Sequence, residues 1–110
     1  MQADPAVTEA RLERLSKVLE DQKALDPFIY RTKEANDIAD AVIIATATSR
    51  RHAQGLAKAL ADASRASGQK YARMEGFDAA QWILIDCNDI IIHIFQEDTR
   101  ALYRLEELWA

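Results

Sequence analysis

The chain has few of the residues that build covalent cross-links or sharp turns: one cysteine, three glycines and two prolines among 110 residues. A single thiol, Cys87, cannot form an intramolecular disulfide, and no second cysteine can join it in a metal cluster. This cysteine usage is typical of a reducing compartment. We therefore expect a cytoplasmic protein without a disulfide framework.

Long apolar runs are also missing. No stretch approaches the roughly 20 apolar residues that a membrane-spanning helix needs. The N-terminus lacks a charged start followed by an apolar core, and it is poor in arginine before Arg11. We therefore expect no membrane span and no targeting segment.

Basic residues are outnumbered, with 14 Lys and Arg against 18 Asp and Glu, which gives a net charge of -4. General binding of nucleic acid through phosphate neutralisation is therefore not expected, whereas a basic protein partner is easily accommodated. A hydrophobic content of 49% and a charged content of 29% are typical of a globular protein. The length predicts one domain over residues 1–110, with residues 1–24 as an N-terminal helix.

The hydrophobic pattern predicts an α/β fold with a mixed sheet of about five strands packed with helices. The expected elements, in chain order, are a helix to about residue 23, strands over 28–31 and 39–46, a helix over 50–67, a strand over 71–75, a hairpin over 82–95 and a final helix. Polar loops are expected over 32–37 and at Gly68. The second strand reads as covered on both faces because its apolar run is unbroken.

Turn and cap residues support the helix boundaries. Pro5 is suited to the first turn of the first helix, and Ser49 can cap the second. Asp98 or Thr99 is expected to cap the last helix. The apolar side of that helix should consist of Leu102, Leu105, Leu108 and Trp109.

The hairpin is the most informative segment. Two runs of isoleucine-rich sequence flank residues 86–89, a composition typical of a tight turn in which Asn88 takes a left-handed conformation. With Cys87 and Asn88 as a two-residue loop, Asp86 is predicted to lie opposite Asp89, and Trp82 opposite His93. Like charges placed opposite each other weaken a hairpin unless solvent or a cation relieves them.

Alternation then gives the hairpin two different faces. One face, which we expect to be buried against helices, carries Ile83, Ile85, Ile90, Ile92 and Ile94. The other carries Trp82, Leu84, Ile91, His93 and Phe95 and ends in the two aspartates. An aromatic anchor beside unpaired acid is typical of a protein interface, although a strand tryptophan is more often partly buried core.

Several separated blocks resemble the ribosomal silencing factor, or Iojap, family, and they cover the chain from about Leu25 to Trp109. These blocks are IADAVIIATATSRRH over residues 38–52, Glu75 with Gly76, residues 82–86, DIIIHIF over 89–95, and Arg100 with Tyr103, Leu105, Glu106, Leu108 and Trp109. Two positions depart from the family pattern, because Asn88 and Ala47 stand where the family usually has glycine. Asparagine can adopt the same turn.

The resemblance implies a nucleotidyltransferase-like fold without catalysis. It implies a protein that binds the large ribosomal subunit through ribosomal protein fourteen, obstructs joining of the small subunit and so represses translation, with a further role in ribosome biogenesis left open. No cofactor, catalytic residue or metal ligand is implied. The contact residues carried over from matching blocks are Trp82, Asp86, Asp89, His93, Arg100 and Tyr103.

The alternative is a metal-dependent nucleotidyltransferase, which needs carboxylates gathered on adjacent strands and a Gly-Ser loop for the triphosphate. Asp37 with Asp40 precedes a strand, Asp86 with Asp89 flanks a turn, and no Gly-Ser loop precedes either pair. We therefore expect no enzyme.

Ser49 and His52 lie one helical turn apart but lack an orienting third group, so hydrolysis is not expected either. Ser49 reads more simply as a cap, and His52 as a packing residue. Arg50, Arg51 and His52 form a small basic cluster that is either a solvated helix start or a contact to RNA phosphate.

Three C-terminal residues each allow more than one interpretation. Arg100 either reaches a partner or holds Asp86 or Asp89 within the domain. Tyr103 is offset from the apolar stripe and can present its hydroxyl outward. Trp109 reads as core or as a contact in a homodimer.

Overall fold

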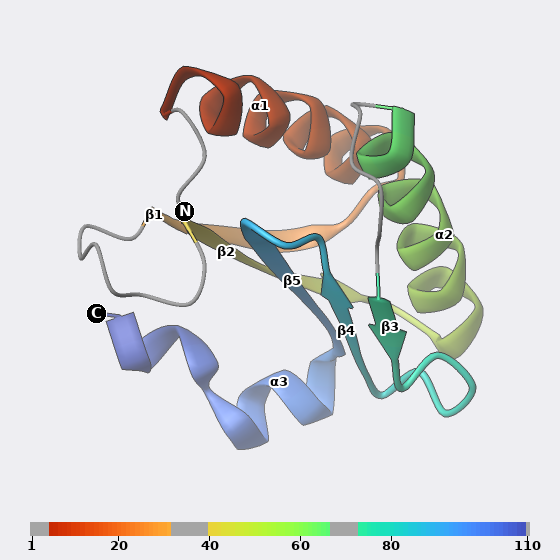
Figure 1. Cartoon of the computed structure of the whole chain (residues 1–110). Helices are drawn as coiled ribbons and strands as arrows, with labels where there is room; N and C mark the ends of the chain where they lie inside the picture. Colours follow the sequence, from red (N-terminus) through yellow and green to blue (C-terminus); the bar gives the residue numbers. More distant parts are fainter. Residues whose placement is uncertain (1–4, 32–39, 67–72, 110) are drawn as a thin grey trace.

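The structure, a computed structural model, describes residues 5–31, 40–66 and 73–109. A mixed sheet with strand order β1-β2-β5-β4-β3 forms its centre (Figure 1). The strands are β1 (Leu25–Arg31), β2 (Ala41–Ala47), β3 (Arg73–Glu75), β4 (Trp82–Asp86) and β5 (Ile90–Gln96). Only β2 and β5 pair in parallel, and every other neighbouring pair is antiparallel. The predicted five-stranded mixed α/β sheet is confirmed.

Helices cover the two faces of this sheet unequally. α1 (Pro5–Asp21) and α2 (Arg50–Ala66), each of 17 residues, lie on one face, whereas α3 (Glu97–Tyr103) has seven and lies on the other (Figure 1). A short 3-10 turn, Leu105–Trp109, follows α3. No helix among the described residues is long and apolar enough to cross a membrane.

The main core lies between the sheet and the two long helices. Leu12 and Leu15 of α1 and Leu56 and Leu60 of α2 are buried there, as their helical spacing predicts. The sheet contributes the buried isoleucines Ile43, Ile83, Ile85, Ile90, Ile92 and Ile94. Every residue of β2 is buried, which confirms that its unbroken apolar run is covered on both faces.

The predicted start of α2 is also confirmed. The backbone N–H of His52 donates to the hydroxyl oxygen of Ser49 over 3.0 Å, so Ser49 caps the helix. The ring of His52 accepts from the backbone N–H of Thr48 and, through its other nitrogen, donates to the carbonyl oxygen of Gln22 over 2.7 Å. His52 therefore joins the start of α2 to the segment after α1, as a packing residue does.

Some predictions concern residues that the structure does not describe. The polar loop over 32–37, with Asp37, lies outside the described residues, and so do Gly68 and Tyr71. The strand predicted over 71–75 is described from Arg73 onward as β3. It ends at Glu75, and the next residue, Gly76, has a left-handed φ of 82°.

The C-terminal helix differs from its prediction. α3 begins at Glu97 rather than at a cap formed by Asp98 or Thr99, and its N-cap residue Gln96 makes no side-chain cap bond. Glu97 and Asp98 in the first turn instead favour the positive end of the helix dipole. Arg104, with a left-handed φ of 48°, ends α3, so the expected apolar stripe does not continue along one helix.

Candidate protein-docking site

The candidate site is the sheet face opposite α1 and α2, called here the α3 face. The register places Ile44 beside His93 and Leu84 beside His93 on its other side, so these three residues share the α3 face. The face also carries the side chains of Phe28, Tyr30, Val42, Thr46, Trp82, Asp86, Ile91 and Phe95.

The predicted division of the hairpin into two faces is confirmed, but its predicted register is wrong. Trp82 pairs with Phe95 and Asp86 with Ile91, so Asn88 and Asp89 form the loop in place of Cys87 and Asn88. A shift of two residues leaves every side chain on the same face, because strand alternation has a period of two. Asp86 and Asp89 therefore do not lie opposite each other.

The backbone conformation and hydrogen bonds of the turn favour this register. Asn88 takes a φ of 74°, and its backbone N–H donates to a carboxylate oxygen of Asp86 over 2.9 Å. The backbone N–H of Cys87 donates to the carbonyl oxygen of Ile90 over 2.9 Å, which closes the hairpin. Both Cys87 and Ile90 are thereby buried in the core.

Asp89 turns toward the other side of the molecule. Its carboxylate forms an ion pair with Arg11 of α1, and its side chain is only 9% exposed. The Arg11 guanidinium also donates to the carbonyl oxygen of Cys87 over 3.3 Å. Asp89 thus clamps α1 onto the hairpin turn, whereas Asp86 stays on the α3 face.

Four rings form one aromatic cluster on the α3 face: Trp82, His93, Phe95 and Tyr103. The ring centroid of Trp82 lies 4.8 Å from that of Tyr103, 5.0 Å from Phe95 and 5.9 Å from His93. These separations are typical of favourable tilted aromatic pairs. Three of the predicted contact residues, Trp82, His93 and Tyr103, are therefore neighbours.

The tryptophan and the histidine are joined by a hydrogen bond. The indole N–H of Trp82 donates to Nδ1 of His93 over 3.0 Å, so this nitrogen carries no proton. Burial lowers the pKa of His93 to about 4, because it disfavours the charged ring. His93 is neutral at pH 7 and fixes the orientation of the indole.

The close approach of Gly76 also positions Trp82. A Cβ atom at Gly76 would overlap the carbonyl oxygen of Trp82, and the positive φ of Gly76 disfavours any L side chain. The turn between β3 and β4 thus requires glycine at this position.

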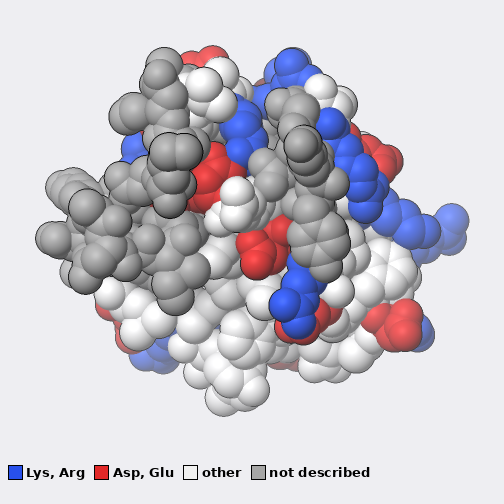
Figure 2. Space-filling model, in the orientation of Figure 1, with Lys and Arg blue, Asp and Glu red and all other residues white. Residues whose placement is uncertain are grey.

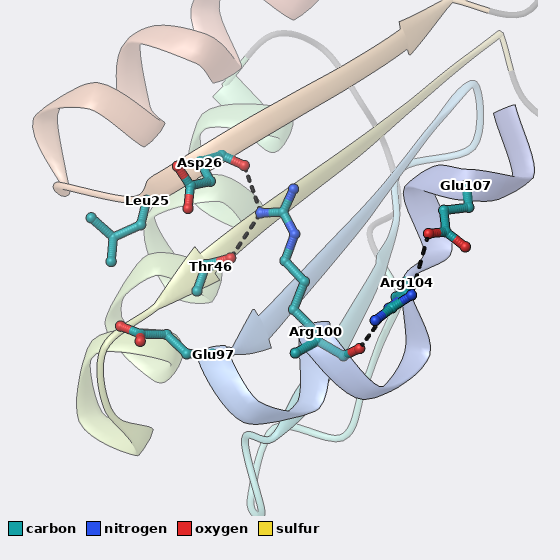
Figure 3. A pocket seen from close by; sticks show the side chains of 8 residues that line it. Leu25, Asp26, Thr46, Glu97, Arg100, Arg104 and Glu107 are labelled. Atoms are coloured by element: carbon teal, nitrogen blue, oxygen red, sulfur yellow. Dashed lines mark hydrogen bonds and ion pairs between the residues drawn. The ribbon is translucent and has the colours of Figure 1, made fainter. Parts of the chain in front are cut away.

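Arg100 reaches from α3 toward the ends of β1 and β2. Its guanidinium donates to the carbonyl oxygen of Asp26 and, over 2.8 Å, to the hydroxyl oxygen of Thr46 (Figure 3). It therefore ties α3 to the end of β2 and the start of β1. These bonds support the interpretation in which Arg100 acts within the domain, through Asp26 and Thr46.

A pocket of about 510 Å³ opens beside Arg100 (Figure 3). Its lining residues mix both charges and small apolar groups: Leu25, Asp26, Thr46, Glu97, Arg100, Ala101, Arg104 and Glu107. Arg104 pairs with Glu107 across 3.8 Å. The pocket offers no single charge to a ligand.

Two exposed leucines were missed by sequence reasoning. Leu102 is 76% exposed and Leu108 72% exposed, although their spacing predicted a buried stripe. Of that stripe, only Leu105 is described as packing on the α3 face, where it joins Val42, Ile44 and Phe95. With Tyr103 at 52%, the C-terminal segment presents apolar side chains to solvent next to the aromatic cluster.

One of the two carboxylate pairs considered for the enzyme alternative, Asp86 with Asp89, is not gathered, and Asp37 of the other pair lies outside the described residues. Asp86 and Asp89 lie on different sides of the hairpin turn. In the part of the chain that the structure describes, no three His, Cys, Asp or Glu side chains gather where they could hold a metal ion.

Comparison with known proteins identifies the family of this chain. The family model described as ribosomal silencing factor during starvation matches residues 5–110. This chain belongs to the ribosomal silencing factor family. The family is one of ribosome-associated regulators of translation.

Individual ribosomal silencing factors match over most of their length. The factor of Zymomonas mobilis is 36% identical over 101 residues, which cover 92% of this chain and 76% of that protein. The factor of Haemophilus influenzae is 35% identical over 101 residues, with 92% and 99% covered. A crystal structure of a Chromobacterium violaceum protein superimposes with a TM-score of 0.86 at 26% identity, with 92% of this chain and 84% of that chain covered.

Proposed function

We propose that this chain binds the large ribosomal subunit through ribosomal protein fourteen and sterically prevents the small subunit from joining. The observation that carries the proposal is the half-buried Trp82 on the α3 face, which the two long helices leave uncovered. Family membership supplies the ribosome as the target. No bond needs to be made or broken, so the action requires no catalytic group.

The α3 face has the composition of a protein-binding surface. Trp82 and Tyr103 are large rings with polar edges, a type that dominates binding energy in interfaces. Leu102 adds exposed apolar area beside them. Asp86, half-buried at the edge of this face, provides negative charge that suits a basic ribosomal protein.

The contact surface of this proposal differs from the six residues carried over from the family. Trp82, Asp86, His93 and Tyr103 remain in it. Asp89 and Arg100 are assigned to holding the domain together, because their side chains bond to Arg11 and to Thr46. His93 acts through its hydrogen bond to Trp82.

The test is co-sedimentation of the purified chain with isolated large subunits. Trp82→Ala should weaken binding by roughly 30-fold, or about 2 kcal/mol, because it removes the central ring of the surface. Tyr103→Ala, at a more exposed ring, should weaken it by a smaller factor. Val7→Ala removes an exposed apolar side chain from α1 and serves as the matched control with unchanged binding.

Because Trp82 also packs within the domain, thermal unfolding must accompany the binding measurement. A folded Trp82→Ala variant that binds large subunits as tightly as the unmodified chain would refute the proposed surface. Subunit joining is measured separately, by adding small subunits to the complex. Normal joining in the presence of a saturating amount of the chain would refute the steric mechanism.

A further inference from the structure

The outer side of α2 carries a straight row of positive charge. Arg51, Lys58 and Arg65 are all exposed and follow each other at intervals of seven residues. Seven residues make two helical turns and a rise of roughly 10 Å, so the three side chains line up along the helix. We call these three residues the α2 row. Figure 2 shows several Lys and Arg side chains, among a few acidic ones, on the side of the molecule where Figure 1 draws α2.

This charge contrasts with the rest of the chain, whose net charge is -4. α2 contains four basic residues and one acid, Asp62, whereas its neighbour α1 contains three basic residues and four acids. A local excess of positive charge on an acidic protein creates an attractive potential for an anionic partner on that side alone.

α2 also departs twice from what favours a helix. Its first turn contains Arg50 and Arg51 and no acid, which opposes the helix dipole. Gly55 lies in its interior, where glycine is less stable than alanine. An added Cβ at Gly55 would meet no atom within 4 Å, so packing does not explain the glycine. Arg51 and Gly55 thus disfavour the helix without a structural contact that compensates for them, and such departures are expected at functional surfaces.

The glycine lies beside the row. Gly55 is exposed, four residues after Arg51 and three before Lys58, so it occupies the same side of the helix. Absence of a side chain there allows another backbone to approach α2 closely.

The three cations have weak partners or none. In the described part of the chain, the side chain of Arg51 makes no hydrogen bond or ion pair. Lys58 lies over the ring of Phe77, with its nitrogen 5.4 Å from the ring centre, which leaves its N–H groups for an acceptor. Arg65 pairs with Asp62 over 3.2 Å, but both side chains are more than half exposed, and such pairs are weak.

Arg50 differs from the row and is excluded from it. Its Nε donates to the carbonyl oxygen of Asp78 over 2.8 Å. Gln54 likewise donates to the carbonyl oxygen of Phe77 over 3.0 Å. Both side chains hold the turn after β3 against α2.

We propose that the outer side of α2 binds the phosphate backbone of RNA, with the α2 row contacting phosphates and Gly55 admitting the backbone close to the helix. Contacts to phosphates carry no sequence information, so this binding is sequence-independent. α2 covers the opposite side of the sheet from the α3 face, so RNA and a protein can be bound at once (Figure 1). Only the choice of large-subunit RNA as the source rests on the proposed function.

The experiment is fluorescence anisotropy of a labelled stem-loop of large-subunit RNA titrated with the full chain between 50 and 200 mM salt. Three phosphate contacts predict a slope of log affinity against log salt of roughly -2 to -3. The double variant Arg51→Glu, Lys58→Glu should lose at least tenfold in affinity at 50 mM salt. The matched control is Arg14→Glu, Lys17→Glu on α1, which changes the net charge equally and should retain most of the affinity.

Gly55→Ala separates RNA contact from helix stability. Alanine should raise the melting temperature by about 4 °C, because glycine is unfavourable in a helix interior. The same variant should bind the stem-loop severalfold more weakly, because its methyl group obstructs the approaching backbone. Unchanged affinity in Gly55→Ala would remove the glycine from the proposal.

Two results would overturn the proposal as a whole. One is equal RNA affinity in the chain and in its Arg51→Glu, Lys58→Glu variant. The other is equally tight binding of a labelled poly-glutamate peptide, which would show attraction to any polyanion. Trp82→Ala separates this proposal from the docking proposal, since it should lose large-subunit binding while keeping affinity for the stem-loop.

Discussion

The two faces of the sheet differ in how they are covered. Beneath α1 and α2, the face carrying Ile83, Ile92 and Ile94 is fully buried and aliphatic. Beneath the short α3, the α3 face carries rings, a histidine and an acid, most of them half-buried. The first face is thus the main core, and the second leaves apolar surface partly uncovered. Adjacent residues of one strand therefore have different surroundings.

The sharpest way to break this comparison is a pair of neighbouring substitutions in β5. Ile92→Ala, on the fully buried face, should lower the free energy of unfolding by about 4 kcal/mol, because it leaves a cavity in the core. Ile91→Ala, on the α3 face, should lower it by only about 1 kcal/mol, because Ile91 is partly exposed. Urea unfolding measures both. Equal losses would show that the two faces are packed alike.

The next largest effect on stability is expected at the ion pair between Arg11 of α1 and Asp89 of the hairpin turn. Arg11→Leu should cost about 3 kcal/mol, since it leaves the carboxylate of Asp89 nearly buried without its cation. Adding Asp89→Leu should restore part of the loss, because no unpaired charge then remains. If the double variant is less stable than Arg11→Leu alone, the loss does not come from an unpaired carboxylate.

Sequence reasoning identified the two hairpin faces because the register differs from the prediction by two residues, a shift that keeps every side chain on its face. It missed the register because the choice of loop depends on Arg11, far away in sequence, which draws Asp89 to the other side. The partners of Arg100 were missed for the same reason, since Thr46 and Asp26 belong to other strands.

The exposed leucines have a local cause that periodicity does not reveal. Leu102 and Leu108 have helical spacing, but the left-handed Arg104 between them interrupts the helix. A non-glycine residue in this conformation carries no clear sequence signal. The helical stripe was therefore predicted in a segment that does not form one continuous helix.

A pH titration sharpens the difference between the faces. Burial places the folded-state pKa of His93 at about 4, below the value of 6.5 for an exposed histidine. The unfolded chain therefore binds an extra proton between these pH values, so stability falls as the pH drops from 6.5 toward 4. This group should contribute a loss of about 2 kcal/mol, discounted for its partial exposure.

His93→Gln supplies the control for that titration, because glutamine can accept the indole hydrogen bond but does not titrate. The difference in unfolding free energy between the chain and this variant should change between pH 6.5 and 4. A constant difference across that range would mean that His93 is not buried as a neutral ring.

The smallest expected effect concerns charge on the α3 face. Asp86→Asn keeps an oxygen that can accept from the N–H of Asn88, so stability should change by less than about 0.5 kcal/mol. Association with large subunits should slow severalfold at low salt and little at high salt, because salt screens the lost attraction. Stopped-flow mixing measures the rate, and an unchanged rate at low salt would exclude an electrostatic role for Asp86.

The pairing of β2 with β5 also affects when the protein can first act. The centre of the sheet joins Ala41 to Ile90, so it cannot form until residue 90 has been synthesised. Tyr103, part of the aromatic cluster, emerges later still. A nascent chain therefore lacks the complete α3 face until residue 103 has been synthesised and has left the ribosome.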